Sequence, residues 1–75
     1  MSIQELNYPV AENITYLINN KGLKQRAIAQ KAGFSFQQLN DMLNGRRLIK
    51  VCDLTKIAAA LDVEPKDLFV KKGGN

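Results

Sequence analysis

Amide side chains gather in one stretch of the chain, where their spacing suits them to hydrogen-bond another molecule. At about 100° per residue, a helix over residues 35–44 places its aliphatic residues on one face and amides and a carboxylate on the other. Amides can pair with the N6 and N7 edge of adenine in the major groove of DNA. A merely solvated face is the alternative, although such faces usually carry Lys and Glu. The outward side chains are Gln37, Gln38, Asn40, Asp41 and Asn44.

Positive charge is concentrated in the same part of the chain. The 75 residues include 11 basic and 7 acidic side chains, for a net charge of +4. Between Lys21 and Lys50, seven basic residues accompany one acid, Asp41, so this stretch carries +6 and the remainder −2. A solvated face and a surface that binds a phosphate backbone are both consistent with this cluster. Charge alone leaves both interpretations open.

The composition argues against several other kinds of chemistry. The chain has no histidine and a single cysteine, Cys52, which excludes an intramolecular disulfide, a structural zinc site and His-based catalysis. Nothing resembles a paired acid and base, so we expect no enzyme, metal or cofactor. No apolar run approaches the roughly 18 residues of a membrane span, and the first residues do not resemble a signal peptide. We therefore expect a cytoplasmic protein without a membrane partner.

The elements that position these side chains are all expected to be helices, in one domain over residues 8–70. Apolar residues recur at helical spacing, and Gly or Pro marks the helix ends. The expected helices cover about 9–20, 24–32, 35–44 and 52–61, with a short last helix starting at Pro65. Residues 1–7 and 71–75 are expected to be flexible termini.

The second and third of these helices predict a helix-turn-helix. They are joined through Gly33, and a steep crossing within three or four residues commonly needs glycine. Ser35 is a good N-cap for the third helix. Ala29, four residues before Gly33, supplies the small side chain that close contact between the two helices needs.

From Gly22 to Phe69, about two-thirds of the chain, the sequence resembles the Cro and phage-repressor (XRE-type) helix-turn-helix family. The segments that carry the resemblance are QRAIAQKAGFS (25–35), LNDMLNG (39–45), LTKIAAALDV (54–63) and DLF (67–69), in the family's order. The resemblance implies an all-α, five-helix, lambda-repressor-like domain with the helix-turn-helix at helices 2 and 3. It also implies sequence-specific binding to double-stranded DNA, usually as a two-fold dimer.

The resemblance further implies roles for individual residues. The positions that look toward bases or adjacent phosphates are Ser35, Phe36, Gln37, Gln38, Asn40 and Asp41. The expected contacts to the phosphate backbone are Lys24, Gln25, Asn44, Arg46, Arg47 and Lys50.

Two of these positions depart from the family's pattern and leave alternatives open. Phe36 lies only about 60° from the apolar stripe, so it either packs half-buried or contacts a thymine methyl group. Asp41 would be repelled by phosphates. It could accept a hydrogen bond from a cytosine amino group, or form a local salt bridge that orients an arginine.

The leading hypothesis is a transcriptional regulator, a repressor from a bacterium or its phage. Its homodimer would place two recognition helices about 34 Å apart on a near-palindromic operator. The candidate dimer surface is Leu68, Phe69 and Val70. The alternatives are an antitoxin whose main ligand is another protein, and a helical adaptor that has lost DNA binding.

Overall fold

A computed structural model describes residues 1–70 of the chain, and within this range every regular element is a helix. The expected all-α fold is therefore confirmed. Four of the expected helices lie within one residue of their expected bounds, and the last one starts at Pro65 as expected. The expectation for residues 71–75 falls outside the described residues. The helices are α1 (Ile3–Asn7), α2 (Val10–Asn20), α3 (Gln25–Ala32), α4 (Phe36–Leu43), α5 (Val51–Leu61) and the 3-10 helix η1 (Pro65–Leu68).

Residues 1–7, expected to be a flexible terminus, contain helix α1, which the sequence pattern did not indicate. The Ser2 hydroxyl accepts a hydrogen bond from the Glu5 backbone N–H at 3.1 Å, and the Glu5 carboxylate accepts one from the Ser2 N–H at 2.8 Å. This reciprocal capping box stabilises the first turn. At the other end of α1, the Asn7 side chain is buried. The helix has only five residues, too few for a periodic apolar pattern.

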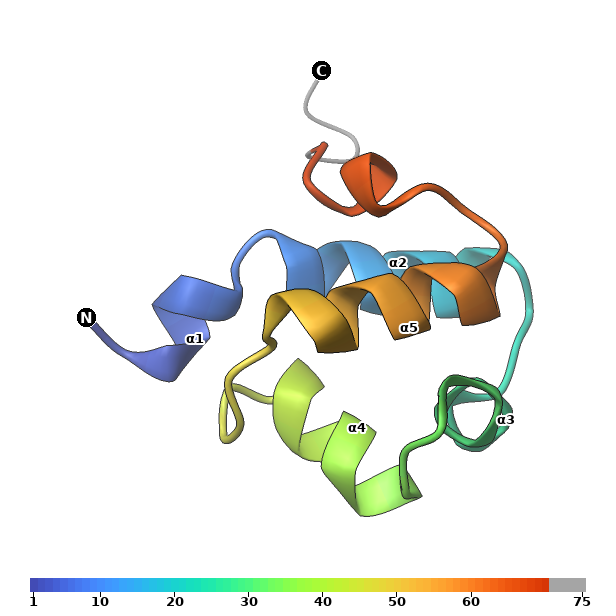
Figure 1. Cartoon of the computed structure of the whole chain (residues 1–75), viewed down its shortest axis with the longest axis horizontal. Helices are drawn as coiled ribbons and strands as arrows, with labels where there is room; N and C mark the ends of the chain where they lie inside the picture. The colour runs from blue at the N-terminus through green and yellow to red at the C-terminus, as the bar shows by residue number, and fades with distance from the viewer. Residues whose placement is uncertain (71–75) are drawn as a thin grey trace.

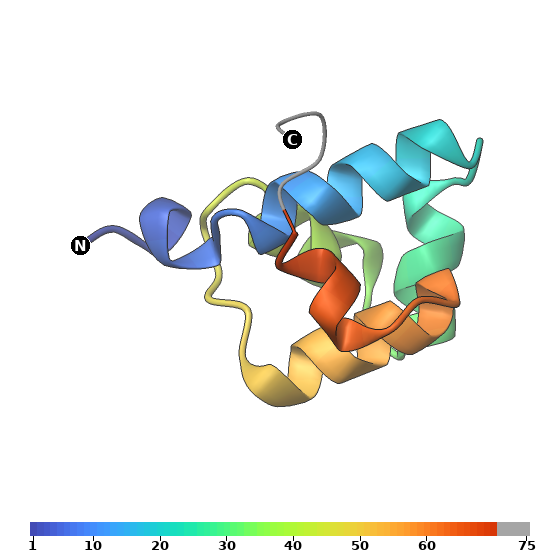
Figure 2. The ribbon, with the colours of Figure 1, turned by 90° about the horizontal axis from the view of Figure 1, so that it is seen from above.

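The core lies between α2, α3, α4 and α5 and is closed by Leu68 of η1. In Figure 1, η1 lies on one side of this core and α4 on the opposite side. Figure 2, a view from above, shows η1 between α2 and α5, which it contacts. The side chains of Ile14, Leu39, Ile57 and Leu68 are fully enclosed. This core fixes α4 by its apolar face and leaves its other face outside.

The turn between α3 and α4 follows from glycine geometry and capping. Gly33 ends α3 in the left-handed conformation, with φ of 89°, which a residue with a Cβ adopts only with strain. The Phe34 N–H then donates to the Ala29 carbonyl at 2.8 Å. Ala29 is completely buried in the core to which α3 and α4 both contribute. The two helices of the predicted helix-turn-helix are therefore α3 and α4.

Within residues 1–70, none of the helices has the length and apolar character needed to cross a membrane.

Candidate nucleic-acid interface

Helix α4 turns its amide face outward, as its sequence predicts. Leu39 and Met42 are fully buried on the core side. Gln37 and Asn44 are exposed, and the Asp41 side chain keeps 29% of its surface accessible. A polar face on a helix fixed by its apolar side is able to enter a groove without moving the core.

Asp41 joins α4 to the basic segment that follows it. Its Oδ1 atom accepts hydrogen bonds from Gln37 Nε2 at 2.8 Å and from Arg46 Nε at 3.1 Å. Of the alternatives considered for Asp41, the structure contains the local salt bridge. Because 59% of the Arg46 side chain is exposed, the pair contributes little stability, about 0–1 kcal/mol. Its main consequence is the orientation of Gln37 and Arg46.

The segment between α4 and α5, residues 44–50, is called the connecting loop below. It starts folded against the end of α4, because the N–H groups of Arg46 and Arg47 both donate to the Asp41 carbonyl, at 2.8 and 3.2 Å. The Asn44 side chain donates to the Asn40 carbonyl at 2.7 Å. These bonds satisfy carbonyls that the helix end would otherwise leave without partners. They also place Asn44 and Arg46 beside the outward face of α4.

The start of α3 reaches the same face. Gln25 Nε2 donates to Asn40 Oδ1 at 3.1 Å, so the first residue of α3 is tied to the middle of α4. Lys24, the N-cap of α3, is exposed beside it. The N–H groups at a helix start attract anions such as phosphate. The structure thus brings Gln25 and Asn40 together on one surface, and their DNA contacts stay predictions.

Three of the residues expected to read bases also have structural contacts at the start of α4. The Ser35 hydroxyl accepts from the Gln38 N–H at 3.1 Å, and the Gln38 side-chain oxygen accepts from the Ser35 N–H at 2.9 Å. The Phe36 ring is 36% exposed, and the Arg26 guanidinium lies 4.7 Å from its centre. Base contacts by these three residues stay predictions.

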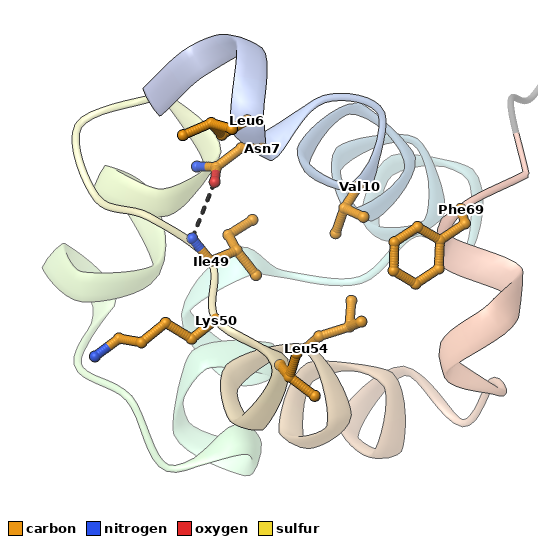
Figure 3. Close-up of a pocket in the computed structure, with 8 residues that line it drawn as sticks. Leu6, Asn7, Val10, Ile49, Lys50, Leu54 and Phe69 are labelled. Atoms are coloured by element: carbon orange, nitrogen blue, oxygen red, sulfur yellow. Dashed lines mark hydrogen bonds between the residues drawn. The ribbon is translucent and has the colours of Figure 1, made fainter. Parts of the chain in front are cut away.

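Arg47 and Lys50 are the other two connecting-loop cations expected to contact phosphates. Arg47 Nε is buried and has no hydrogen-bond partner within residues 1–70. Lys50 caps α5, where its N–H donates to Asp53 Oδ2 at 3.1 Å, and its exposed side chain extends away from Phe69 (Figure 3). Phosphate contacts by these two residues stay predictions. Of the two arginines in the connecting loop, Arg46 has the more accessible guanidinium.

Asn7 holds the end of α4 and the connecting loop, and sequence reasoning missed this role. Its amide nitrogen donates to the carbonyls of Met42, at 3.0 Å, and Arg47, at 2.9 Å. Its amide oxygen accepts from the Ile49 N–H at 2.9 Å (Figure 3). The S-x-x-E capping signal could have revealed α1. Nothing in the sequence pairs residue 7 with backbone groups 35 to 42 residues away.

One concave site lies beside the connecting loop. A pocket of about 190 Å³ lies beside Asn7, between Leu6, Leu54 and Phe69, and is lined mainly by apolar side chains (Figure 3). Among residues 1–70, no three His, Cys, Asp or Glu side chains are grouped so that they could hold a metal ion.

Comparison with known proteins agrees with this geometry. The sequence matches the helix-turn-helix family HTH_3 over residues 14–68, a range that contains α3, the turn, α4 and α5. No curated protein sequence matches significantly.

Two solved structures are similar along most of the chain. One is the restriction-modification controller protein C.AhdI from Aeromonas hydrophila, with a TM-score of 0.76 and 30% identity over 80% of this chain and 91% of that one. The other is the hypothetical transcription factor NHTF from Neisseria, with a TM-score of 0.81 and 26% identity over 96% of this chain and 83% of that one. The family match spans more than half of the chain, and the residues that form the turn lie within it. The chain therefore belongs to the XRE-type helix-turn-helix family of DNA-binding transcription regulators.

Proposed function

We propose that this protein is a transcriptional repressor whose helix α4 reads the major groove of an operator. The observation that carries the proposal is the unit formed by Gln37, Asp41 and Arg46, which joins an exposed amide to an exposed cation on one surface. A bound repressor excludes other proteins from the same stretch of groove.

The hydrogen-bonding capacity of this unit suits DNA. Gln37 Nε2 gives one N–H to Asp41, which leaves its second N–H and its Oε1 atom for the N7 and N6 edge of adenine. Arg46 uses Nε on Asp41, so its terminal amines remain for a phosphate oxygen. Gln25 and Asn40, bonded to each other, then border the groove on the α3 side.

The remaining predicted contacts also divide into those to phosphates and those to bases. Phosphate contacts by Lys24, Gln25, Asn44, Arg46, Arg47 and Lys50 would fix affinity and register without reading sequence. Among the base-reading positions, Gln37 is the leading reader, because Ser35 and Gln38 cap the start of α4.

The proposed functional unit is a homodimer on a near-palindromic operator. Two-fold symmetry would place the two α4 helices about one DNA turn, roughly 34 Å, apart. Leu68 is completely buried in the core, which corrects its expected place in the dimer surface. Phe69 and Val70 are 56% and 59% exposed and remain the candidates.

Selection of bound duplexes from a random pool, followed by salt titration, tests the proposal. We expect a recovered site with two inverted half-sites. With about six phosphate contacts, log affinity should fall against log salt with a slope near −5. Failure to bind any duplex at low salt would contradict the repressor proposal, and recovery of single, asymmetric half-sites would contradict the dimer.

A protein partner as the main ligand is the second candidate. The observation that favours it is the exposure of apolar side chains beside one pocket, where Val51 is 78% and Phe69 56% exposed. This antitoxin-type or adaptor function predicts co-purification with the product of a neighbouring gene. It also predicts no sequence preference in the selection described above.

A further inference from the structure

We propose that α1 serves as a brace for the connecting loop, and that Asn7 is the positioning residue through which it acts. The inference rests on the proposed function, since it assumes that this loop contacts the DNA backbone. The brace itself consists of the three hydrogen bonds from Asn7 to Met42, Arg47 and Ile49.

The three bonds cover nearly the whole loop. They begin at the last turn of α4, pass through Arg47 and end at Ile49, one residue before the N-cap of α5. All three partners are backbone atoms, so the brace fixes the path of the main chain. The Asn7 side chain is only 2% exposed, which keeps water from replacing these bonds. Figure 3 shows the bond to Ile49.

Close packing of α1 on Gly45 is an independent sign of the same contact. Gly45 has a φ of 77°, and a Cβ built there would lie 2.9 Å from the Cβ of Gln4. A separation this short does not occur between real side chains, so α1 and the loop touch where only glycine fits. Helix α1 therefore meets the loop both at Gly45, through Gln4, and further along, through Asn7.

The middle of the loop depends on this contact. At its start, the N–H groups of Arg46 and Arg47 are held by Asp41, and at its end the Lys50 N–H is held by Asp53. Between them, the hydrogen bonds of the Arg47 carbonyl and the Ile49 N–H both run to Asn7. Without Asn7, this segment keeps the packing of Ile49 against the core but loses both of these backbone hydrogen bonds, and Arg47 loses its fixed position toward phosphates.

The chain offers a matched control for a test of this role. Asn13 is 3% exposed, and its amide nitrogen also donates to two backbone carbonyls, those of Leu68 at 2.7 Å and Val70 at 2.8 Å. Asn7→Ala and Asn13→Ala thus remove the same kind of buried contact from different places. Because Asn13 holds the backbone beside the candidate dimer residues Phe69 and Val70, binding of both variants is measured on a duplex with a single half-site, with concentrations corrected for the folded fraction.

We expect Asn7→Ala to bind about tenfold more weakly than Asn13→Ala. Its slope of log affinity against log salt concentration should be less steep by about one to two, because roughly that many phosphate contacts are lost. A purely structural role would lower the folded fraction and leave the slope of the folded protein unchanged. Equal affinity and equal slope for the two variants would overturn the inference.

Hydrogen exchange in the unchanged protein tests the brace without any variant or DNA. We expect the Ile49 amide to exchange as slowly as amides within α4, since its acceptor is the buried Asn7 side chain. Exchange as fast as that of an exposed loop amide would overturn the brace even if DNA binding is normal. Failure of the unchanged protein to bind any duplex, with Ile49 protected, would instead reject the proposed function.

Discussion

Asp41 determines which donors and acceptors the outer face of α4 can offer. A glutamine on a helix surface can rotate its amide, and either end can then face a base. The hydrogen bond to Asp41 holds Gln37 Nε2 toward the carboxylate. It therefore leaves Gln37 one N–H donor and the Oε1 acceptor for another molecule. Since Asp41 also binds Arg46, the single acid in the basic stretch orients both the amide proposed to read a base and the cation proposed to bind a phosphate.

Gln37→Ala and Gln38→Ala should have different consequences, although the two residues are neighbours. Gln37→Ala should cost about 1–3 kcal/mol on the selected site and relax preference at one base pair, because it removes the proposed adenine contact. Binding to a panel of singly substituted duplexes measures this effect.

Gln38→Ala provides the contrast. It removes half of a capping box and should lower unfolding free energy by about 0.5–2 kcal/mol while keeping the order of preference among duplexes. A Gln37→Ala protein that binds its best site unchanged would show that α4 presents a different face to DNA.

For individual residues, the sequence predicted which side chains of α4 face outward better than it predicted their hydrogen-bond partners. Helical periodicity set by Leu39 and Met42 correctly placed Gln37 and Asn44 outside. The salt bridge of Asp41 was one of several alternatives, because Arg46 lies beyond the helix end, where periodicity no longer fixes direction. The role of Asn7 depends on backbone groups brought close only by the complete fold.

Among the elements, the contact between α3 and α4 sets the orientation of α4 on the core. Ala29 is fully buried one turn before Gly33, and the Ala29 carbonyl also accepts the N–H of Phe34 in the turn. The crossing therefore depends on a side chain no larger than a methyl group at this point.

Ala29→Leu should destabilise the protein by about 1–3 kcal/mol, because extra methyl groups in a packed core force neighbours apart. DNA affinity of the folded fraction should fall as well, since α4 would tilt away from its position. Ala27→Leu is the matched control, because Ala27 is an exposed residue of the same helix. Chemical denaturation and DNA titration check both. Equal stability of the two variants would contradict the proposed tight contact.

The periodic elements were predictable and the short one was not. Helices α2 to α5 have eight or more residues each, so their apolar stripes and glycine or proline boundaries were visible in the sequence. Helix α1 has one turn and a half, and its presence depends on a capping box and on contacts with residues far along the chain.

For the molecule as a whole, the positive charge belongs to the part of the chain that forms the candidate interface. The stretch from Lys21 to Lys50 contains α3, α4 and the connecting loop, whereas the remainder carries the net negative charge. An uneven distribution of this kind orients a protein as it approaches a polyanion and speeds association.

Dimeric binding should be sensitive to the spacing of half-sites. Inserting about five base pairs between the two halves of the selected site turns one half to the opposite side of the duplex. We expect affinity to fall to that of a duplex with a single half-site, which serves as the control in gel-shift or anisotropy titrations. Unchanged affinity for the spaced site would mean that single copies bind independently.

The sequence could not specify the pairing surface, because only the fold showed that Leu68 is enclosed.

The contact between α1 and the connecting loop lies partly outside the region that matches the family, which starts at residue 14. A fragment cut to residues 14–68 would retain α3 and α4 and lack Asn7. Its backbone between the Arg47 carbonyl and the Ile49 N–H would then lack both hydrogen bonds to Asn7, and on the proposed function it would have to become ordered on each encounter with DNA. Ordering the backbone costs roughly 1–2 kcal/mol of conformational entropy per residue. With α1 present, this cost is met when the protein folds, so it does not reduce the free energy of DNA binding.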